Sequence, residues 1–493
     1  RFSRRNRGPQ ELSDSTIQGR QTMDGLRFLG HVGIRPTREE FQILVDRPVY
    51  EAVKRYTTQA DMQEIDGWAR SFYTLEGHLE SIMQFSKPLL PEPTDSTWAD
   101  TKREVYAQVT NLFPKVNSLM FEQDMDRIPY EAASAAGYGY SGKKGEGDNF
   151  SRAKSIANAA VRQFNEDIDK FGFDLARNHL IEQGTPDVAF TRTQLAKLPS
   201  IKVRIVFGEA FHNILIEGLS AAPLLAAFKS ADTFYVTGKD PTIFVPKLLF
   251  NLGLDQGWFI CLDWKAFDAT VQLWEIDHAF NCLKGLLNFP SLLTERAFEY
   301  ARESFKQRKL AAPDGTLWMR TSGIPSGSYF TNIIGSIINY TRIKYLCNRE
   351  GLVVRNCYVQ GDDSITWLTS SPRPDIYRLA EIGEPFGWRI NLMKTLITDS
   401  SQEVTFLGRS QIHQFNIRER LKVLRLMCFP EYEVQNPAIS TARVRAIARD
   451  AGFRDPLYNK ILYDLKRRFG EAQSVPPHLL TYVDRFDFQD VNM

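Results

Sequence analysis

The chain has 493 residues, 43% of them hydrophobic, which is enough for a large buried core. Its 61 Lys and Arg residues are balanced by 59 Asp and Glu residues, so overall charge does not indicate nucleic-acid binding. If the chain binds a nucleic acid, its positive charge must be concentrated locally. The five cysteines are scattered and include no CxxC pair, which argues against a structural zinc site or a disulfide framework. Because we find no run of 18 apolar residues, we expect no membrane-spanning helix.

The first hundred residues carry no motif that indicates chemistry. Residues 1–20 are rich in arginine and predict a flexible basic arm. Residues 37–85 have a mostly helical pattern, and the proline-rich stretch 87–93 predicts a connector.

A glycine-rich loop follows at 137–149. Its glycines match GxGxxG by count, but 131–136 has a helical pattern and no strand precedes the loop, so we reject a dinucleotide-binding site. Two interpretations remain open. The segment is either a mobile surface loop, or a loop whose backbone, with Lys143 and Lys144, binds the phosphates of a nucleic acid.

A strand with alternating polar and apolar residues is predicted at 199–207. The period of two places Lys202 and Arg204 on one face and Val203 and Ile205 on the other. One interpretation is a half-exposed strand with a solvated edge. The other is a cationic strand that neutralises a triphosphate, in which Arg204 grips phosphate with two N–H groups and Lys202 acts as a point charge.

An apolar run at 257–263 ends in a carboxylate, Asp263. This pattern is typical of a buried strand with a functional residue at its C-terminal end. Asp268 follows five residues later, and a helical pattern covers 271–287. We therefore expect Asp263 at an edge of a sheet, where acids from a neighbouring strand can join it.

The Gly/Ser/Pro loop 322–331 opens a long predicted helix that ends near Arg349. One face of this helix consists of isoleucines. The other face is small or polar and is formed by Ser328, Thr331, Gly335, Asn339 and Arg342. This face is predicted to handle the ribose and base of a nucleotide, and the glycines of the loop to let backbone approach a ligand closely.

Two apolar runs flank Gly361, Asp362 and Asp363 within 358–368, which predicts a tight β-hairpin with the glycine in its turn. Adjacent acids repel each other unless something positive neutralises them, and a divalent cation does so well. For the dipeptide alone, the alternative is an ordinary solvated turn. If the strand that ends at Asp263 is a neighbour, the three acids can share two Mg²⁺ ions, as nucleotidyl transfer requires.

In this order and spacing, the acidic and Gly/Ser blocks resemble motifs A, B and C of viral RNA-dependent RNA polymerases. The amino-acid sequences of these blocks are most similar to those in the polymerases of partitiviruses, which have segmented double-stranded RNA genomes. The polymerases of picobirnaviruses are the second most similar. The resemblance covers about 137–410 and implies an α+β right-hand fold of fingers, palm and thumb, with an antiparallel palm sheet packed on helices. The residues that carry it are Asp263 and Asp268 (motif A), Ser326, Gly327 and Thr331 (motif B), and Gly361, Asp362 and Asp363 (motif C).

The resemblance also implies a division of the chain. The expected parts are an N-terminal extension that bridges fingertips and thumb (1–95), fingers (96–255), palm with motif A (256–274), a fingers–palm connection (275–320), palm with motifs B to E (321–410), and thumb with a C-terminal tail (411–493).

Roles for single residues follow from the same resemblance. Asp263 and Asp362 would ligate two Mg²⁺ ions, with Mn²⁺ as a substitute, and Asp363 would be a weaker or indirect ligand. Lys394 would protonate the pyrophosphate leaving group, with a plain surface lysine as the alternative. Binding of the NTP and its ribose is expected from Lys202, Arg204, Asp268, Ser326, Gly327, Thr331 and Asn339, and binding of the template from Gly142, Lys143, Lys144 and Arg409.

Some assignments stay open. Gly335 stands where polymerases of positive-strand RNA viruses carry a ribose-reading Asn, so either Asn339, one turn further, or the nearby Asn332 would touch the 2′-OH. Residues 403–409 resemble motif E and are expected to form a strand pair. Over 411–470, twelve Lys and Arg face six Asp and Glu, which fits either a thumb that holds product RNA or a charged solvent face.

The expected function is RNA-dependent RNA synthesis for a segmented double-stranded RNA virus. RNA, NTPs and capsid protein would be its partners, no membrane would be involved, and it would work inside the virion or in the host cytoplasm. One alternative is a reverse transcriptase, against which stand Gln360 before the Gly-Asp-Asp tip and the acid at Asp268. The other is a catalytically silent RNA-binding capsid component, against which stand the three intact acids.

Overall fold

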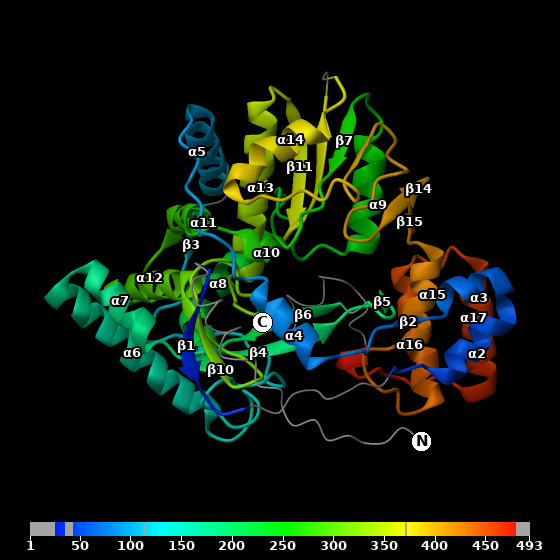
Figure 1. Ribbon diagram of the computed structural model, residues 1–493, viewed down its shortest axis with the longest axis horizontal. Coiled ribbons are helices and arrows are strands. Elements are labelled where there is room, and N and C mark those ends of the chain that lie inside the picture. The colour runs from blue at the N-terminus through cyan, green and yellow to red at the C-terminus, as the bar shows by residue number, and fades with distance from the viewer. Residues whose placement is uncertain (1–24, 35–42, 113, 201, 370–371, 480–493) are drawn as a thin grey trace.

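The computed structural model describes residues 25–34, 43–112, 114–200, 202–369 and 372–479 (Figure 1). The chain contains many helices and a palm sheet that is wholly antiparallel, so the predicted α+β class is confirmed. The expected basic arm at 1–20 lies outside the described residues.

A four-stranded antiparallel sheet corresponds to the predicted palm. Its strands, in spatial order, are β11 (Val354–Gln360), β12 (Asp363–Leu368), β7 (Trp258–Cys261) and β13 (Leu396–Thr398). β11 and β12 form the predicted hairpin, with Gln360 opposite Asp363 and Gly361 at a left-handed φ of +58° that suits glycine. Because Thr366 of β12 lies opposite Ile260 of β7, the end of β7 reaches toward the hairpin tip.

Helices cover both faces of this sheet. They are α5 (Ser96–Asn111), α11 (Leu273–Leu286) and α13 (Thr331–Arg349) on one face and α9 (Pro241–Leu252) on the other (Figure 1). The alternation of side chains along β7 explains the arrangement, since Ile260 packs in the core of α11 and α13 whereas Phe259 packs in the core of α9.

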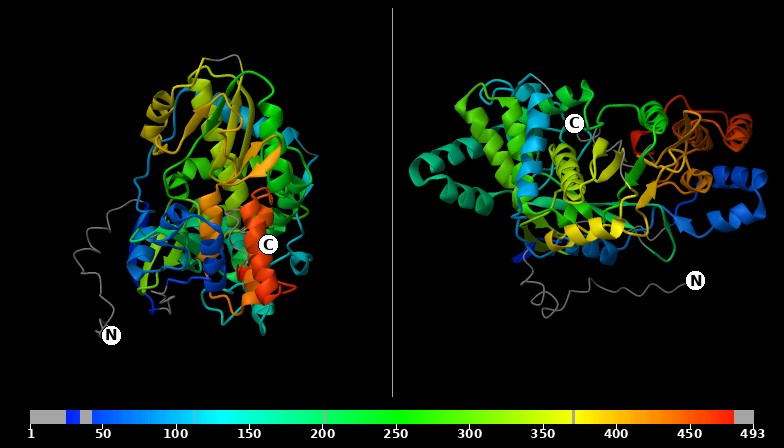
Figure 2. Two further views of the ribbon diagram at one scale, coloured as in Figure 1. Left: turned by 90° about the vertical axis from the view of Figure 1, so that its right-hand side faces the viewer. Right: turned by 90° about the horizontal axis from the view of Figure 1, so that it is seen from above.

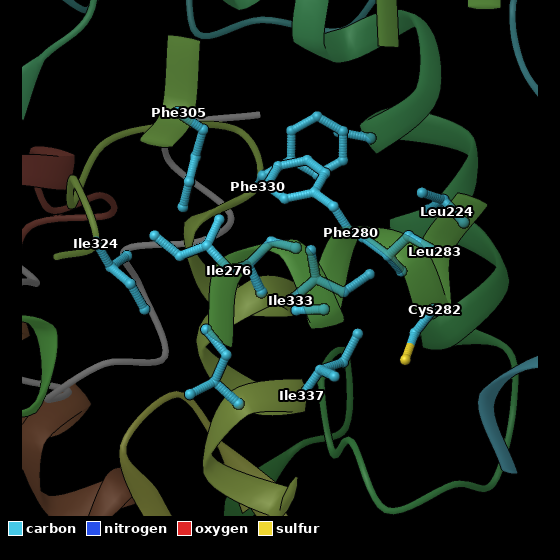
Figure 3. Close-up of a cluster of buried hydrophobic side chains, with 14 of the residues drawn as sticks. Leu224, Ile276, Phe280, Cys282, Leu283, Phe305, Ile324, Phe330, Ile333 and Ile337 are labelled. Atoms are coloured by element: carbon cyan, nitrogen blue, oxygen red, sulfur yellow. The ribbon is translucent and has the colours of Figure 1, made fainter. Parts of the chain in front are cut away.

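The contact between α11 and α13 is a closely packed apolar core (Figure 3). The rings of Phe280 and Phe330 meet edge to face, with centroids 5.1 Å apart. Ile276, Ile333 and Ile337 converge on the same region, as Figure 3 shows. Burial of such side chains contributes about 1.5–3 kcal/mol each, so this core fixes α13 firmly behind the palm hairpin.

The prediction that one face of α13 handles a nucleotide is wrong for its middle and end. Every residue from Ile333 to Cys347 is buried. Arg342, expected on the polar face, is fully buried and pairs with Glu275 of α11 at 2.6 Å. The polar residues of this face therefore hold helices together and do not line an open cleft.

A second sheet of five strands forms the fingers side. In spatial order its strands are β1 (Leu26–His31), β10 (Thr316–Arg320), β9 (Arg308–Ala311), β4 (Asp187–Thr193) and β6 (Val203–Gly208). The helices beside it are α4 (Leu75–Met83), α6 (Asn149–Phe171), α7 (Phe173–Gln183), α8 (Phe211–Lys229) and α12 (Leu292–Lys306). The sheet joins strands that are nearly 300 residues apart in sequence, because β1 pairs with β10.

The thumb side is helical. Its helices are α15 (Arg420–Cys428), α16 (Pro437–Asp450) and α17 (Pro456–Phe469), packed with α2 (Arg47–Tyr56) and α3 (Gln59–Ile65) from the N-terminal part (Figures 1 and 2). The N-terminal part thus supplies a strand to the fingers sheet and two helices to the thumb core. This placement agrees with a bridging extension, and the exact domain boundaries stay a prediction.

The remaining short elements complete the fold and correct three local predictions. They are β2 (Trp68–Ala69), β3 (Val116–Asn117), β5 (Ala196–Lys197), β8 (Leu287–Asn288), α10 (Phe267–Thr270), α14 (Ile376–Gly383), β14 (Ser410–Ile412) and β15 (Phe415–Ile417). Residues 131–136 form turns and not a helix. The helical pattern of 37–85 becomes three separate helices in its described part. The expected strand pair at 403–409 is only a bridge between Phe406 and Arg409, and the true pair follows it.

The expectation that no apolar stretch is long enough to span a membrane needs a correction at α8. By length and composition α8 could cross a membrane, but 78% of its apolar stretch is buried inside the protein. It carries a buried glutamate, Glu217, and packs against α6 and α12. These features are typical of the core helix of a globular fold.

Three buried histidines make stability depend on pH. Burial lowers the pKa of His78, His212 and His278 from 6.5 to about 4. The unfolded chain therefore binds up to three more protons than the folded one, and the stability present above pH 6.5 is lost as pH falls toward 4. We expect the urea midpoint at pH 5 to lie below that at pH 7, and His78→Gln to reduce this difference. The exposed His413→Gln is the matched control, and an unchanged difference in His78→Gln would contradict the assignment.

Candidate active site

Asp263 lies two residues beyond β7 and is tied to the segment predicted as motif D. Its backbone N–H donates to Thr395 Oγ1 at 3.1 Å, and its carbonyl accepts from the N–H of Asn391 at 2.7 Å. Lys394, between these partners, is exposed. Asp268 is half-buried in α10, one short turn after the strand end. Two hydrogen bonds thus join Asp263 to the segment predicted as motif D.

Two hydrogen bonds to residues of α13 hold the hairpin tip in place. The N–H of Gly361 donates to Ser336 Oγ at 2.8 Å, and Asn339 Nδ2 donates to the carbonyl of Gly361 at 2.9 Å. These contacts use the polar atoms of the turn that face the helix, and they leave Asp362 half-buried at the tip. These two hydrogen bonds fasten the turn to α13, so the backbone of the hairpin sets the position of Asp362.

Asp363 points to a different side from the tip. Its Oδ1 accepts from the N–H of Ser364 and its Oδ2 from the N–H of Leu407, both at 3.0 Å. Cys261 is close enough for the carboxylate to add to the burial that raises the pKa of this thiol to about 12. Both carboxylate oxygens of Asp363 therefore contact backbone, and its role as a weaker or indirect metal ligand stays a prediction.

The carboxylates suit divalent metal ions by their chemistry. Continuing the antiparallel register of β7 and β12 places Asp263 across from the Asp362–Asp363 tip. Oxygen donors at adjoining strand ends are what Mg²⁺ prefers. In the described residues, however, no three His, Cys, Asp or Glu side chains converge as one metal-binding group. Asp263 and Asp362 fit the ions as direct ligands, and Asp363 fits as their support.

The prediction that Asn339 reads the ribose is wrong. Its side chain is fully buried, its Oδ1 accepts from Trp264 Nε1 at 2.8 Å, and its Nδ2 donates to the carbonyls of Gly361 and Asp363. It ties motifs A, B and C together. Asn332 lies at the hairpin instead, only half-buried, with its amide near Gly361 and its Oδ1 accepting from the Tyr235 hydroxyl.

The loop of motif B is fastened to β6. Ser326 Oγ donates to the carbonyl of Ile205 at 3.0 Å, and the N–H of Phe207 donates to the carbonyl of Ser326 at 2.7 Å. Gly327 has a φ of +114°, and a Cβ there would collide with the carbonyl of Phe207. Thr331 closes the loop by donating to the carbonyl of Pro325. The glycine is needed for this close approach of two backbones.

The fastened loop sets the position of the cationic residues beside it. Lys202 precedes β6 and Arg204 lies on it, and both side chains are exposed. Because β6 is bonded to the motif B loop, the two charges are held next to that loop. That they form a cationic strand over a nucleotide channel stays a prediction.

Two of the residues predicted to bind template are buried and serve the fold. Lys144 is 5% exposed and donates to Ser134 Oγ at 2.8 Å, and burial lowers its pKa. Arg409 is 1% exposed, donates to the carbonyl of Leu407 at 2.8 Å and pairs with Asp450. Neither can reach RNA phosphates. Gly142 and Lys143 are exposed, with Gly142 at a φ of +73°, so they stay candidates.

Sequence reasoning missed a buried charge network behind the motif B loop. Arg308 pairs with Asp187 at 2.7 Å and with Glu209 at 3.2 Å. Glu217 of α8 accepts from the N–H of Tyr329 at 2.8 Å and from the Ser328 hydroxyl. The signal was the single glutamate within the apolar pattern of 211–229. In the basic cluster 302–309, Arg302 and Arg308 are buried, and Lys306 and Lys309 are half-buried.

The amino-acid sequence is similar to a family model and to several known proteins. A family model described as viral RNA-dependent RNA polymerase matches residues 44–465. The RNA-directed RNA polymerase of Atkinsonella hypoxylon virus (isolate 2H) is 23% identical over 333 residues, covering 54% of this chain and 50% of that protein. The polymerase of Cryptosporidium parvum virus 1 is 30% identical over 156 residues, covering 30% and 29% respectively. The chain thus spans half or less of these curated relatives.

Solved structures share the fold. The Sicinivirus 3Dpol RNA-dependent RNA polymerase aligns with a TM-score of 0.68 at 14% identity, covering 92% of this chain and 98% of that one. The RNA-dependent RNA polymerase of a human picobirnavirus aligns with a TM-score of 0.62 at 14% identity, covering 92% and 89%. At this identity the likeness shows the fold alone, and it confirms the predicted right-hand architecture.

The family match spans most of the described chain, from the N-terminal helices of the thumb to its last helix. It contains the strand-end Asp263, the motif B loop and the Asp362–Asp363 hairpin. The resemblance predicted from the motifs is confirmed, and the chain belongs to the family of viral RNA-dependent RNA polymerases.

Proposed function

We propose that this protein is an RNA-directed RNA polymerase that copies the genome of a double-stranded RNA virus. It transfers a nucleotidyl group from an NTP to the 3′-OH of an RNA strand under the direction of a template. The single observation that supports this most strongly is the hairpin of β11 and β12, which shares one antiparallel sheet with β7, the strand that leads to Asp263.

The proposed mechanism divides the work among residues that adjoin one another. Asp263 and Asp362 would hold two divalent metal ions, most simply Mg²⁺, and these would supply activation of the 3′-OH and neutralisation of charge on the triphosphate. Asp363 supports the tip through its contacts with Ser364 and Leu407. Lys202 and Arg204 offset the charge of the triphosphate, and Arg204 can donate to it with two N–H groups.

Ribose selection and proton transfer complete the proposal. Asp268 accepts a hydrogen bond from a ribose hydroxyl, with Asn332 as a half-buried amide beside the tip. Ser326, Gly327 and Thr331 act by shaping the loop, because their polar groups are bonded within the protein. The exposed Lys394 donates a proton to the leaving pyrophosphate. Gly142 and Lys143 contact the template.

The biological setting is part of the same proposal. RNA template, product duplex and NTPs are the binding partners, and synthesis takes place inside the virion or in the host cytoplasm in contact with capsid protein. The reverse-transcriptase and silent-component alternatives have no specific observation in their favour.

The proposal is tested by incorporation of labelled nucleotides on single-stranded RNA, with Mg²⁺, with and without primer. We expect NTPs and not dNTPs to be incorporated, and Asp362→Ala to abolish the signal. Incorporation of dNTPs would support a reverse transcriptase instead. Tight RNA binding without any incorporation, with Mg²⁺ or Mn²⁺, would contradict catalysis.

A further inference from the structure

A groove of about 430 Å³ lies where the palm meets the thumb, outside the candidate active site. It is bounded by the first half of α9, the turn between β14 and β15, and the turn after α16. On α9, Ile243 and Lys247 face the groove, whereas Val245 and Leu249 are buried in the core of the palm sheet. The groove is therefore on the side of α9 that faces away from that sheet.

The segment that contains β14 leads from the catalytic hairpin to the groove. Leu407 contacts Asp363, and from there β14 carries the chain away to the turn that borders the groove. This turn holds His413 and Gln414 at φ values of +51° and +68°. Positive φ values are uncommon for residues other than glycine, although less so for histidine than for glutamine, so Gln414 holds its conformation at some cost. The turn places Phe415, 43% exposed, at the rim.

The charge of the groove is positive. Lys247, Arg449 and Arg454 line it, all three are exposed, and its lining contains no acid. Three acids are close in sequence: Asp240 caps α9 by accepting from the N–H and hydroxyl of Thr242, Asp450 pairs with Arg409 and Arg418, and Asp455 pairs with Arg420. Across the described chain, no ion pair joins any of the three groove cations to an acidic side chain. Their charge is thus available to an anion.

The groove also offers a flat stacking surface. The guanidinium of Arg454 lies over the ring of Phe415, with its carbon 3.3 Å from the ring centroid. Phe453 contributes a second ring to the lining. Nucleobases stack on aromatic rings and on guanidinium planes, and phosphates bind Lys and Arg. Free anions such as inorganic phosphate would use the charge but not the rings.

We propose that this groove binds nucleotide units of single-stranded RNA, with phosphates on Arg449 and Lys247 and a base against the Arg454–Phe415 pair. A free nucleotide has the same chemistry and is the other possible source of the ligand. The choice of RNA rests on the proposed polymerase function. The volume falls within the usual range for small-ligand sites and suits one or two nucleotides.

The test is photocrosslinking of a short single-stranded RNA that contains 4-thiouridine to the full chain, without NTPs or Mg²⁺, followed by mass spectrometry. We expect crosslinks in the peptides that carry Phe415 and 449–454. The double variant Arg449→Glu/Arg454→Glu should lower their yield about tenfold or more, since each lost phosphate contact weakens binding. A matched control, Lys54→Glu/Lys460→Glu, reverses two exposed thumb cations outside the groove and should leave the yield unchanged.

Further arms separate the possible results. Competition by ATP that removes only the groove crosslink assigns the site to free nucleotides, and persistence of the crosslink assigns it to the RNA strand. Asp362→Ala should keep the groove crosslink, so loss of polymerase activity and loss of this site are distinguishable. Equal yield in the Arg449→Glu/Arg454→Glu variant, or displacement by a polyglutamate peptide at lower concentration than by RNA, would overturn the proposal.

Discussion

Asp263→Asn and Asp362→Asn are each expected to lower the rate of NTP incorporation by about 10³-fold or more, which corresponds to about 4 kcal/mol. Each variant removes a charged oxygen donor from the place where two strand ends meet, and an amide neutralises a metal ion far less well. Asp363→Asn is expected to cost less, about ten- to a hundredfold. It keeps one acceptor but loses one hydrogen bond, to Ser364 or to Leu407.

The measurement is the initial rate on one primed RNA template at saturating Mg²⁺, with circular dichroism to verify folding. Asp255→Asn is the matched control because this exposed acid only pairs with the exposed Arg355. A rate for Asp363→Asn as low as for the other two would show that Asp363 binds metal directly. Retention of half the activity in Asp362→Asn would contradict the proposed catalytic centre.

Arg308→Leu is expected to destabilise the fold by about 3–5 kcal/mol, because it leaves Asp187 and Glu209 as buried carboxylates without their cation. All three side chains are almost completely buried. They join β9, β4 and the end of β6, so the loss should spread to the strand that carries Arg204. The measurement is the urea midpoint of unfolding, with Arg355→Leu as the control at an exposed pair, expected within about 0–1 kcal/mol.

The pH dependence of this variant gives a second check. Burial raises the pKa of Glu209 above its usual range, while Arg308 opposes the shift. Without Arg308 the carboxyl is protonated more readily, and the protonated form carries no buried charge. Since a raised pKa in the fold favours stability at low pH, the deficit of Arg308→Leu should be smaller at pH 5 than at pH 8. An equal deficit at both would contradict a charge effect.

Local patterns predicted the strands and the turn of the centre well. The apolar run before Asp263 became β7, the runs around Gly361 became one hairpin, and both met in one antiparallel sheet. Strand periodicity and turn chemistry are properties of a few neighbouring residues, so they can be read without knowledge of distant partners. The order of these blocks then indicated the family.

The errors concern polar residues whose environment depends on distant segments. Asn339, Lys144 and Arg409 have the residue types of binding groups, yet each is buried against partners from elsewhere in the chain. Helical spacing places Asn339 on a polar face but does not tell whether that face meets solvent or the palm hairpin. In the same way, no local signal shows that α2 and α3 pack in the thumb.

The sequence by itself determined the two strand-end acids, the glycine turn between the palm strands, and the polymerase family, because each rests on short-range patterns in a fixed order. Only the tertiary structure decided which polar side chains remain available to ligands. Burial is set by packing between segments hundreds of residues apart, and a buried polar group must find its hydrogen-bond partners there. For this reason Asn339 is buried and hydrogen-bonded to the neighbouring motifs, whereas Lys202 and Arg204 are exposed.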